Sequence, residues 1–481
     1  MRAVGLVAGP LLFVLVLLLP VPREMGVPAQ RTAALVAWMA TWWLTVPVPL
    51  QATALLPLLV LPLLGVAGFD RAAVPYANNV IFLFLGGFFI AAAMEHWGLH
   101  RRVAYAILAA VGTDARMVVL AFILSTAFMS MWISNTATAV MMMSMATAVL
   151  ALARTGEQGV EAPGKGSIGG LGPALVLGVA YAASIGGMAT LIGTPPNAIF
   201  AGAARELLGV EFGFGRWLRV GLPIVLVLVP ACWLLLVTLF PTRGEIPALA
   251  ERVRSERTGL GPLRGGERWT LVVFLMAVTA WVMRDPKDIG AVRIPGIATW
   301  LPAVTDSWIA IAAALLLFVV PVSWREMRFA LDWKTARAAP WGMLLLFGGG
   351  LSLADAVQSS GLSGWIGSLL TGMAGQPKLL VIAVVAAMFT ALTELASNAA
   401  VSALAMPLLA AIAPALGQDP LVLMQVAALA SSLAFVLPVS TPPNTVAFAT
   451  GEVTVLQMAK AGIVMVAVSI ATITVVMTMI G

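Results

Sequence analysis

Charged residues are scarce in this chain. Asp, Glu, Lys and Arg together make up 10% of its 481 residues, whereas 61% are hydrophobic. The mean hydropathy is +1.01. A soluble fold could not bury so much apolar surface, so a soluble enzyme or binding module is excluded and the lipid bilayer must act as the solvent. The sequence predicts an all-α polytopic membrane protein.

Cysteine and histidine are also scarce. The chain has one cysteine, Cys232, and two histidines, His96 and His100, which lie at the end of a predicted span. One cysteine cannot form an intrachain disulfide, and neither a metal cluster nor a Ser–His pair is available at membrane depth. Gly164-Lys165-Gly166 lacks the strand and spacing of a nucleotide site. We therefore expect neither an intramembrane enzyme nor ATP-driven transport.

Long hydrophobic runs are abundant, and windows of about 19 residues predict about eleven transmembrane helices, one of them at 50–67. Two further apolar runs, residues 117–152 and 378–415, are too long for one simple crossing and carry polar motifs near their middle. A limb of about 17 residues covers roughly 25 Å as a helix. Each run is therefore predicted to form a re-entrant hairpin with its polar motif at the tip.

The distribution of basic residues predicts the orientation in the membrane. Residues 243–268 and 323–339 form two basic loops, which the positive-inside rule assigns to the cytoplasm. Alternation of the spans then gives a cytoplasmic N-terminus, an external C-terminus, and cytoplasmic Arg101 and Arg102. We expect a multi-pass protein of the cell inner (plasma) membrane. The net charge of +6 is explained by these loops, and no nucleic-acid partner is expected.

The sequence contains an internal repeat. "FLGGFFIAAAMEHWGL" at 84–99 aligns with "FGGGLSLADAVQSSGL" at 347–362, and the same offset of 263 places Ser134-Asn135-Thr136 on Ser397-Asn398-Ala399. "GTPPNAIF" at 193–200 matches "STPPNTVAF" at 440–448. Four spans and one hairpin separate the first helices of the two copies, so these helices run in opposite directions. An inverted repeat of this kind is typical of secondary transporters, whose sites lie near the bilayer midplane.

The repeat divides the chain into four predicted regions. These are 1–78, N-terminal scaffold helices; 79–240, the first repeat with hairpin 117–152 and broken helix 171–206; 241–340, a cytoplasmic loop and linking helices; and 341–481, the second repeat with hairpin 378–415 and broken helix 421–450.

Two proline pairs stand inside long apolar runs and predict broken helices. Each proline removes a donor and frees an upstream carbonyl. Free carbonyls suit a hard cation such as Na⁺, and exposed helix N-termini suit an anion. The predicted helix-break motifs are Thr194, Pro195, Pro196 and Asn197 in the first repeat, and Thr441, Pro442, Pro443 and Asn444 in the second.

Taken together, "SNT" at 134–136, "SNA" at 397–399, "GTPPN" at 193–197 and "STPPN" at 440–444 resemble the divalent anion/sodium symporter family, the INDY-like dicarboxylate, citrate and sulfate transporters. The resemblance implies eleven helices and two opposed hairpins, a homodimer, and a transport domain that moves against a scaffold domain in an elevator-type motion. It also implies sodium-coupled symport of a divalent anion into the cell, either a C4-dicarboxylate or citrate.

The resemblance further implies at least two Na⁺ sites and one substrate site. The implied sodium ligands are Ser130, Ser134, Asn135 and the Gly193 backbone at one site, and Thr393, Ala396, Asn398 and the Ser440 backbone at the other. The implied substrate residues are Ser134, Asn135, Thr136, Ser397, Asn398, Ala399, Thr441 and Pro442. Repeat symmetry independently pairs Ser130 with Thr393, since both carry a hydroxyl and match at the offset of 263.

No Lys or Arg lies in any of these motifs. Burying a dianion without a fixed cation is costly, so Na⁺ is expected to bind before the anion. Ala399 stands where the family commonly has a second Thr, which leaves sulfate, another anion, or sodium-independent anion exchange open. A channel is the alternative from another class. Glu394 has two interpretations, a functional intramembrane carboxylate or a group that orients the second hairpin.

Overall fold

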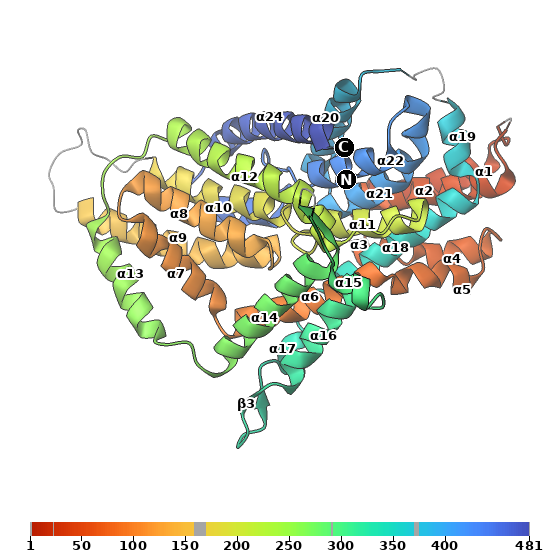
Figure 1. The fold of residues 1–481 in the computed structure, drawn as a ribbon. Helices are drawn as coiled ribbons and strands as arrows, with labels where there is room; N and C mark the ends of the chain where they lie inside the picture. The colour runs from red at the N-terminus through yellow and green to blue at the C-terminus, as the bar shows by residue number, and fades with distance from the viewer. Residues whose placement is uncertain (1, 23, 158–169, 290–291, 370–374, 481) are drawn as a thin grey trace.

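The computed structural model describes residues 2–22, 24–157, 170–289, 292–369 and 375–480, and these residues are mostly helical (Figure 1). Gly164-Lys165-Gly166 lies outside the described residues. All further statements about the fold concern the described part of the chain.

The N-terminal region contains a broken span. Its elements are α1 (Arg2–Leu18), α2 (Val27–Thr45), α3 (Leu50–Thr53), α4 (Leu56–Leu63), α5 (Phe69–Ala73) and the 3₁₀ helix η1 (Val74–Ala77). The sequence predicts one span at 50–67, but Pro57 has no N–H for the Thr53 carbonyl, and the helix divides there. The two short helices together cover roughly 18 Å, which is less than a bilayer core of roughly 30 Å.

The two repeats contain the same seven helices in the same order. The first repeat has α6 (Asn79–His96), α7 (Leu99–Val111), α8 (Ala115–Ser130), α9 (Asn135–Glu157), α10 (Leu171–Gly187), α11 (Pro195–Leu208) and α12 (Phe214–Leu239). The second has α18 (Trp341–Ser359), α19 (Leu362–Leu369), α20 (Lys378–Leu395), α21 (Asn398–Ile412), α22 (Pro420–Ala430), α23 (Pro442–Ala449) and α24 (Val455–Ile480), with the 3₁₀ helix η3 (Pro414–Leu416) after α21.

Backbone conformation follows the repeat as well. Gly98 precedes α7 with φ = 69°, and Gly361 precedes α19 with φ = 82°. Only glycine adopts these values without strain, so both copies use a glycine to turn the chain from the first helix into the short arm that follows.

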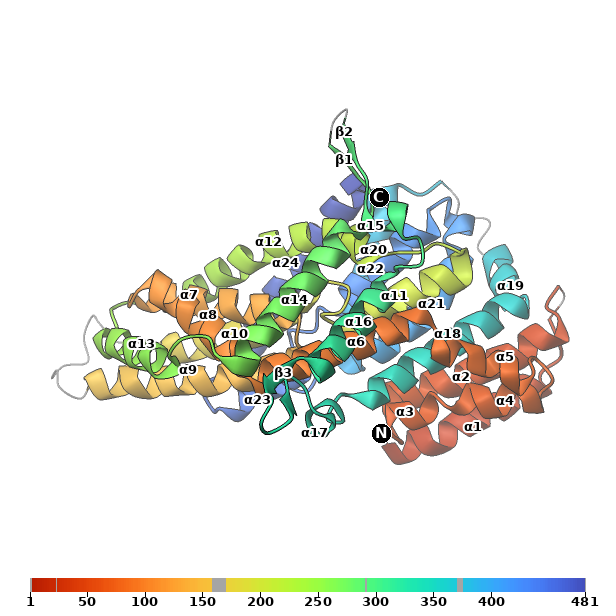
Figure 2. The same cartoon turned by 60° about the horizontal axis from the view of Figure 1, so that its bottom comes forward.

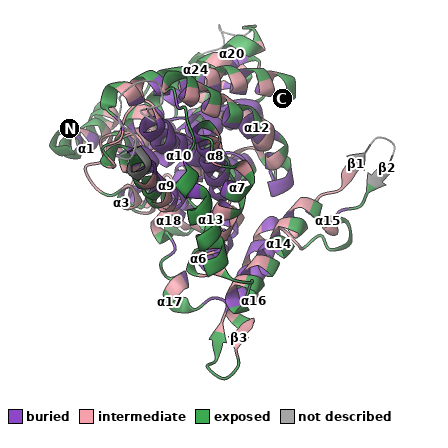
Figure 3. Cartoon of the chain, turned by 90° about the vertical axis from the view of Figure 1, so that its left-hand side faces the viewer, coloured by how far each residue is buried: buried purple, intermediate pink, exposed green. Residues whose placement is uncertain are grey.

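The linking region joins the repeats and supports α6. It contains α13 (Pro247–Leu260), α14 (Gly265–Arg284), β1 (Lys287–Ile289), β2 (Val292–Ile294), α15 (Ile297–Trp300), α16 (Asp306–Val319), β3 (Pro321–Ser323), β4 (Arg328–Phe329) and α17 (Trp333–Ala336). β1 and β2 pair antiparallel, as do β3 and β4, and both hairpins project from the helical body (Figures 2 and 3). α16 packs along α6.

Six helices in the described part of the chain are long and apolar enough to cross a membrane. Other apolar helices have only 10–17 residues. Four of them, α8, α10, α21 and α22, begin or end at a hairpin tip or at the irregular segment that precedes a proline pair. The chain is therefore a multi-pass membrane protein, while the count of eleven spans stays a prediction.

The buried core lies where the two repeats interlock. Every residue of α10 is buried, as its purple ribbon in Figure 3 shows, and α10 packs on α8. The second limb of each broken helix packs on the other repeat: α11 contacts α21 and α22, and α23 contacts α9 and α10. The hairpins and proline turns of both repeats therefore belong to one interior.

Candidate functional site

The first hairpin changes direction between α8 and α9, at residues 131–134. The Ser130 Oγ atom lies 2.8 Å from the Asn135 Oδ1 atom and 2.6 Å from the carbonyl oxygen of Ala183 on α10. Ser130 is fully buried. The tip therefore gathers a hydroxyl, an amide oxygen and a main-chain carbonyl at the end of α10.

The second hairpin builds the same arrangement. The Thr393 Oγ1 atom lies 2.7 Å from the Asn398 Oδ1 atom and 2.8 Å from the carbonyl oxygen of Ser431, directly after α22. Thr393 is fully buried. Thr393 and Asn398 are the repeat equivalents of Ser130 and Asn135, so the structure joins the two predicted pairs in the same way.

Each cluster contains more oxygen atoms than protons to share between them. A hydroxyl carries one proton and can donate it to only one of its two neighbouring oxygen atoms. The other close oxygen contact then has no proton between its atoms, which is unfavourable without a cation. A small set of hydroxyl, amide and carbonyl oxygen atoms is the ligand chemistry of a hard cation, so both clusters fit Na⁺.

The proline turns are closed by asparagine side chains. The Asn197 Nδ2 atom donates to the carbonyls of Gly187 and Thr190, at 3.0 and 2.8 Å. The Asn444 Nδ2 atom donates to the carbonyls of Ala434 and Leu437, both at 3.1 Å. The acceptors are equivalent at the offset of 247, so each TPPN motif pins the irregular segment that precedes it.

The prolines begin helices in both repeats. Pro195 and Pro196 start α11, and Pro442 and Pro443 start α23. A missing N–H costs nothing in the first turn of a helix. The breaks begin earlier than the proline pairs, after Gly187 and after Ala430, which corrects the expectation that the helices break at the prolines themselves.

Gly187 lies against the first oxygen cluster. A Cβ atom on residue 187 would lie 2.5 Å from the Asn135 Oδ1 atom and 3.2 Å from the Gly193 carbonyl oxygen. Both oxygen atoms therefore surround a space that a single carbon atom would fill, and Asn135 and Gly193 are two of the predicted sodium ligands. In the second repeat the equivalent residue is Ala434, which is fully buried, so the two clusters differ in shape.

Four buried oxygen atoms at repeat-equivalent positions have no hydrogen-bond partner in the described part of the chain. They are Ser184 Oγ and Ser431 Oγ, and Asn197 Oδ1 and Asn444 Oδ1. Buried polar atoms without a partner are costly and call for a water, an ion or a ligand. Ser184 and Ser431 were missed from sequence, although Ala183-Ser184 and Ala430-Ser431 align at the offset of 247.

The predicted substrate residues differ in their exposure. Ser134 and Thr136 are exposed at the start of α9, and Pro442 is exposed at the start of α23. Ser397 and Asn398 are half-buried. Ala399 and Thr441 are only 3% and 4% exposed. The predicted substrate residues of the first hairpin are therefore more exposed than those of the second hairpin.

Three of the predicted sodium ligands make contacts that hold the backbone. The Ser134 Oγ atom accepts from the Ala137 N–H at 3.3 Å and caps α9. The Ser440 hydroxyl donates to the Leu437 carbonyl at 2.7 Å, and Ala396 is the buried residue that ends α20. Among the described residues, no hydrogen bond joins Ser440 to the Thr393–Asn398 cluster.

Glu394 fastens the second hairpin to the irregular segment after α22. Its carboxylate accepts from the backbone N–H groups of Phe435, Val436 and Leu437 at 2.7, 2.9 and 3.3 Å. Of the two interpretations made from sequence, these contacts favour the orienting role. In the first repeat the equivalent residue is Met131, whose carbonyl accepts from the Thr190 hydroxyl at 2.5 Å.

The chain matches a known family along its whole length. Residues 1–481 match the family described as the sodium:sulfate symporter transmembrane region. The chain is 38% identical over 464 residues to the sodium-dependent dicarboxylate transporter SdcS of Staphylococcus saprophyticus, covering 96% of this chain and 88% of that protein. It is 36% identical over 466 residues to SdcS of Staphylococcus aureus strain USA300, with the same coverage.

Two solved structures share the fold. Neisseria gonorrhoeae MtrF, described as illuminating a class of antimetabolite efflux pumps, superposes with a TM-score of 0.58 at 12% identity, over 96% of each chain. The Alcanivorax borkumensis YdaH transporter superposes with a TM-score of 0.57 at 13% identity, over 94% of this chain and 98% of that one. At this identity the likeness concerns the fold alone.

Proposed function

Because the chain belongs to the sodium:sulfate symporter family, we propose that it is a secondary active transporter that couples the entry of Na⁺ to the uptake of a divalent anion. The substrate is a C4-dicarboxylate such as succinate, malate or fumarate, or citrate. The names of the relatives, sodium-dependent dicarboxylate transporters, support the dicarboxylate.

The observation that carries this proposal is the pair of matching oxygen clusters. Ser130 with Asn135, and Thr393 with Asn398, each meet a main-chain carbonyl within 2.8 Å of the hydroxyl oxygen. A channel needs no such duplicated, proton-poor cluster in its buried core, whereas a sodium-coupled carrier needs sites for the driving ion beside the site for the anion.

The order of binding follows from charge. Among the described residues, no Lys or Arg donates a hydrogen bond to the hairpin tips or the proline turns. An anion entering this space meets only hydroxyl, amide and main-chain groups, and neutral hydrogen bonds do not offset the desolvation of two charges. Na⁺ bound at two or more sites supplies the missing positive charge, so Na⁺ binds first and the dianion second.

The transport cycle that fits this arrangement is an elevator motion in a homodimer. The hairpins and broken helices of both repeats interlock and move together as the transport domain, while the N-terminal and linking helices serve as the scaffold. The protein resides in the plasma membrane with a cytoplasmic N-terminus and an external C-terminus, in agreement with its two basic loops.

Uptake of labelled succinate, citrate and sulfate into proteoliposomes tests the function. We expect succinate to accumulate when Na⁺ is high outside, and not when choline replaces it. Uptake that needs only an internal anion would instead identify an exchanger, and sulfate uptake without succinate uptake would identify a sulfate carrier. A current that reverses at the equilibrium potential of one permeant ion, independent of the other gradient, would identify a channel.

A further inference from the structure

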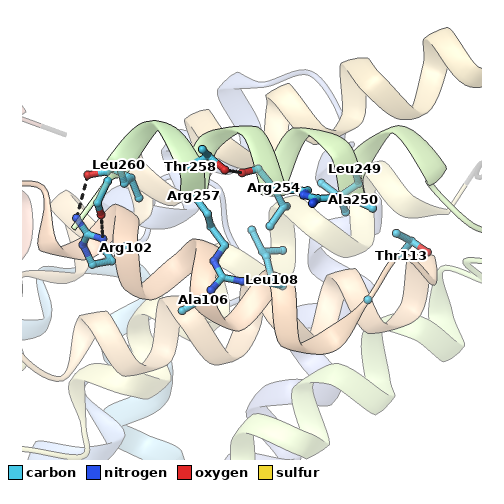
Figure 4. Close-up of a pocket in the computed structure, with 14 residues that line it drawn as sticks. Arg102, Ala106, Leu108, Thr113, Leu249, Ala250, Arg254, Arg257, Thr258 and Leu260 are labelled. Atoms are coloured by element: carbon cyan, nitrogen blue, oxygen red, sulfur yellow. Dashed lines mark hydrogen bonds between the residues drawn. The ribbon is translucent and has the colours of Figure 1, made fainter. Parts of the chain in front are cut away.

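A cavity of about 640 Å³ lies between α7 and α13, away from the hairpin tips (Figure 4). Both helices are short connectors at one end of the molecule: α7 joins α6 to the first hairpin, and α13 joins α12 to α14 (Figure 2). None of the predicted sodium or substrate residues lines this cavity.

The cavity is held open by contacts at both of its ends. At one end, the backbone pairs Ala115 N–H with the Gly244 carbonyl and Ile246 N–H with the Thr113 carbonyl, at 3.0 and 2.9 Å. At the other end, Arg102 binds Glu267 at 2.6 Å and donates to the Gly261 carbonyl at 2.8 Å. The walls are therefore fixed independently of anything that occupies the space between them.

The floor of the cavity is apolar. Leu108 comes from α7, and Leu249 and Val253 come from α13, and all three are buried at 3%, 2% and 6% exposure. The exposed Ala106 adds a small side chain to the α7 wall (Figure 4). These three side chains are already covered by protein, so on α7 a hydrocarbon chain can reach only the exposed Ala106 and Ala109.

The rim of the cavity is cationic. Arg254 and Arg257 on α13 are exposed and line it, and no ion pair joins either of them to another residue in the described ranges. Arg102 pairs with Glu267, and Glu256 pairs with Arg101 and Arg252. The exposed Glu251 lies one helical turn before Arg254, and no ion pair joins the two among the described residues. Two guanidinium groups without an ion pair in the described part of the chain therefore line the cavity.

We propose that this cavity binds an anionic phospholipid of the cytoplasmic leaflet, with the phosphate on Arg254 and Arg257 and the start of an acyl chain against Ala106 and Ala109 of α7. Charge complementarity and this exposed apolar wall favour a lipid, and the positive-inside rule predicts both connectors at the cytoplasmic face. The bound lipid would tie together the two connectors through which the hairpin and α12 reach the rest of the molecule.

Lipid binding is measured by native mass spectrometry of the purified, delipidated full chain. Phosphatidylglycerol is compared with phosphatidylcholine of the same acyl chains. We expect phosphatidylglycerol to bind preferentially, and Arg254→Ala with Arg257→Ala to weaken it roughly thirtyfold, from the usual contribution of two basic residues near a membrane surface. Arg243→Ala with Arg264→Ala removes the same charge from exposed loop positions outside the cavity and should leave binding unchanged.

A third variant separates a lipid from a free phosphate. Ala106→Trp fills the space along the α7 wall of the cavity and keeps both arginines, so it should weaken the binding of phosphatidylglycerol. The proposal would be overturned if both lipids bound equally, or if the two double variants lost the same affinity. It would also be overturned if inorganic phosphate displaced the lipid and Ala106→Trp left lipid binding unchanged. The assay does not depend on the proposed transport function, so either can fail alone.

Discussion

The two repeats build the same oxygen cluster but support it differently. In the first repeat, Gly187 leaves room beside Asn135 and Gly193, and the irregular segment after α10 is buried almost throughout. In the second repeat, Ala434 replaces the glycine, and the segment is partly exposed from Val436 to Ser440. The hydroxyl–asparagine pair is thus retained. The carbonyl oxygen comes from Ala183 in the first repeat and from Ser431, one position beyond the equivalent residue, in the second, and the surrounding packing has diverged.

The hairpins are also fastened by different chemistry. The first uses a neutral hydrogen bond from the Thr190 hydroxyl to the Met131 carbonyl, whereas the second uses the Glu394 carboxylate and three N–H groups. Bonds to an ionised group are roughly twice as strong as neutral ones. The more exposed segment, in the second repeat, is held by the stronger hydrogen bonds. This indicates that both repeats need a rigid segment next to the oxygen cluster.

Removing either cluster asparagine should have the largest effect. Asn135→Ala and Asn398→Ala each delete the amide oxygen that the cluster shares, and each should abolish sodium-driven uptake of the labelled anion in proteoliposomes. Full expression and an unchanged elution profile serve as the folding control. Sodium-driven uptake that survives in one variant would remove that asparagine from the site and make the two repeats unequal in function.

Gly187→Ala and Ala434→Gly test the difference in shape directly. The new Cβ in the first variant would clash with the Asn135 amide oxygen, and overpacking of this kind costs about 1–3 kcal/mol. We expect the half-saturating Na⁺ concentration for uptake to rise roughly 5- to 150-fold. Ala434→Gly should change it far less. If the two variants behave alike, Gly187 does not border a sodium site.

Glu394→Gln and Thr190→Val compare the two fastenings. The glutamine keeps the size of the side chain and loses the charge, so the three N–H groups lose charge-assisted bonds, with an expected cost of about 1.5–3 kcal/mol. Thr190→Val removes one neutral bond, at about 0.5–1.5 kcal/mol. Thermal unfolding and the Na⁺ dependence of uptake should both change more for Glu394→Gln. The reverse order would contradict the conclusion that the Glu394 bonds hold the second hairpin more strongly than the Thr190 bond holds the first.

Ala399→Thr should have the smallest effect. The threonine restores the hydroxyl that its repeat equivalent Thr136 carries, and one added hydrogen bond is worth about 0.5–1.5 kcal/mol, so succinate affinity should rise by roughly tenfold at most. Ala399 is only 3% exposed, which limits the room for the new methyl group. Unchanged or weaker succinate binding would show that residue 399 does not reach the substrate.

The sequence predicts features that depend on local chemistry. Repeated SN and TPPN motifs inside apolar runs indicate where regular helix gives way, and the structure has non-helical segments at 131–134, 188–194, 396–397 and 431–441. The pairing of Ser130 with Thr393 follows from one repeat offset. These features can be predicted because the missing N–H of proline and the exclusion of polar groups from lipid depend only on residues within the same segment.

Features that depend on partners far away in the sequence could not be predicted. The three N–H groups on Glu394 come from residues 41–43 positions away, and the need for glycine at 187 appears only when Asn135 lies beside it. The division of the span predicted at 50–67 has a local cause in Pro57, but proline inside membrane helices is common enough that a kinked single helix was equally compatible.

The central claim is that Na⁺ bound at the two oxygen clusters supplies the positive charge that the anion needs. It is tested most directly by equilibrium binding of labelled succinate to the purified protein while choline replaces Na⁺ at constant ionic strength. We expect saturable binding in Na⁺, with an affinity that falls steeply as Na⁺ is withdrawn, and no measurable binding in choline. Equal succinate affinity in Na⁺ and in choline would contradict this claim.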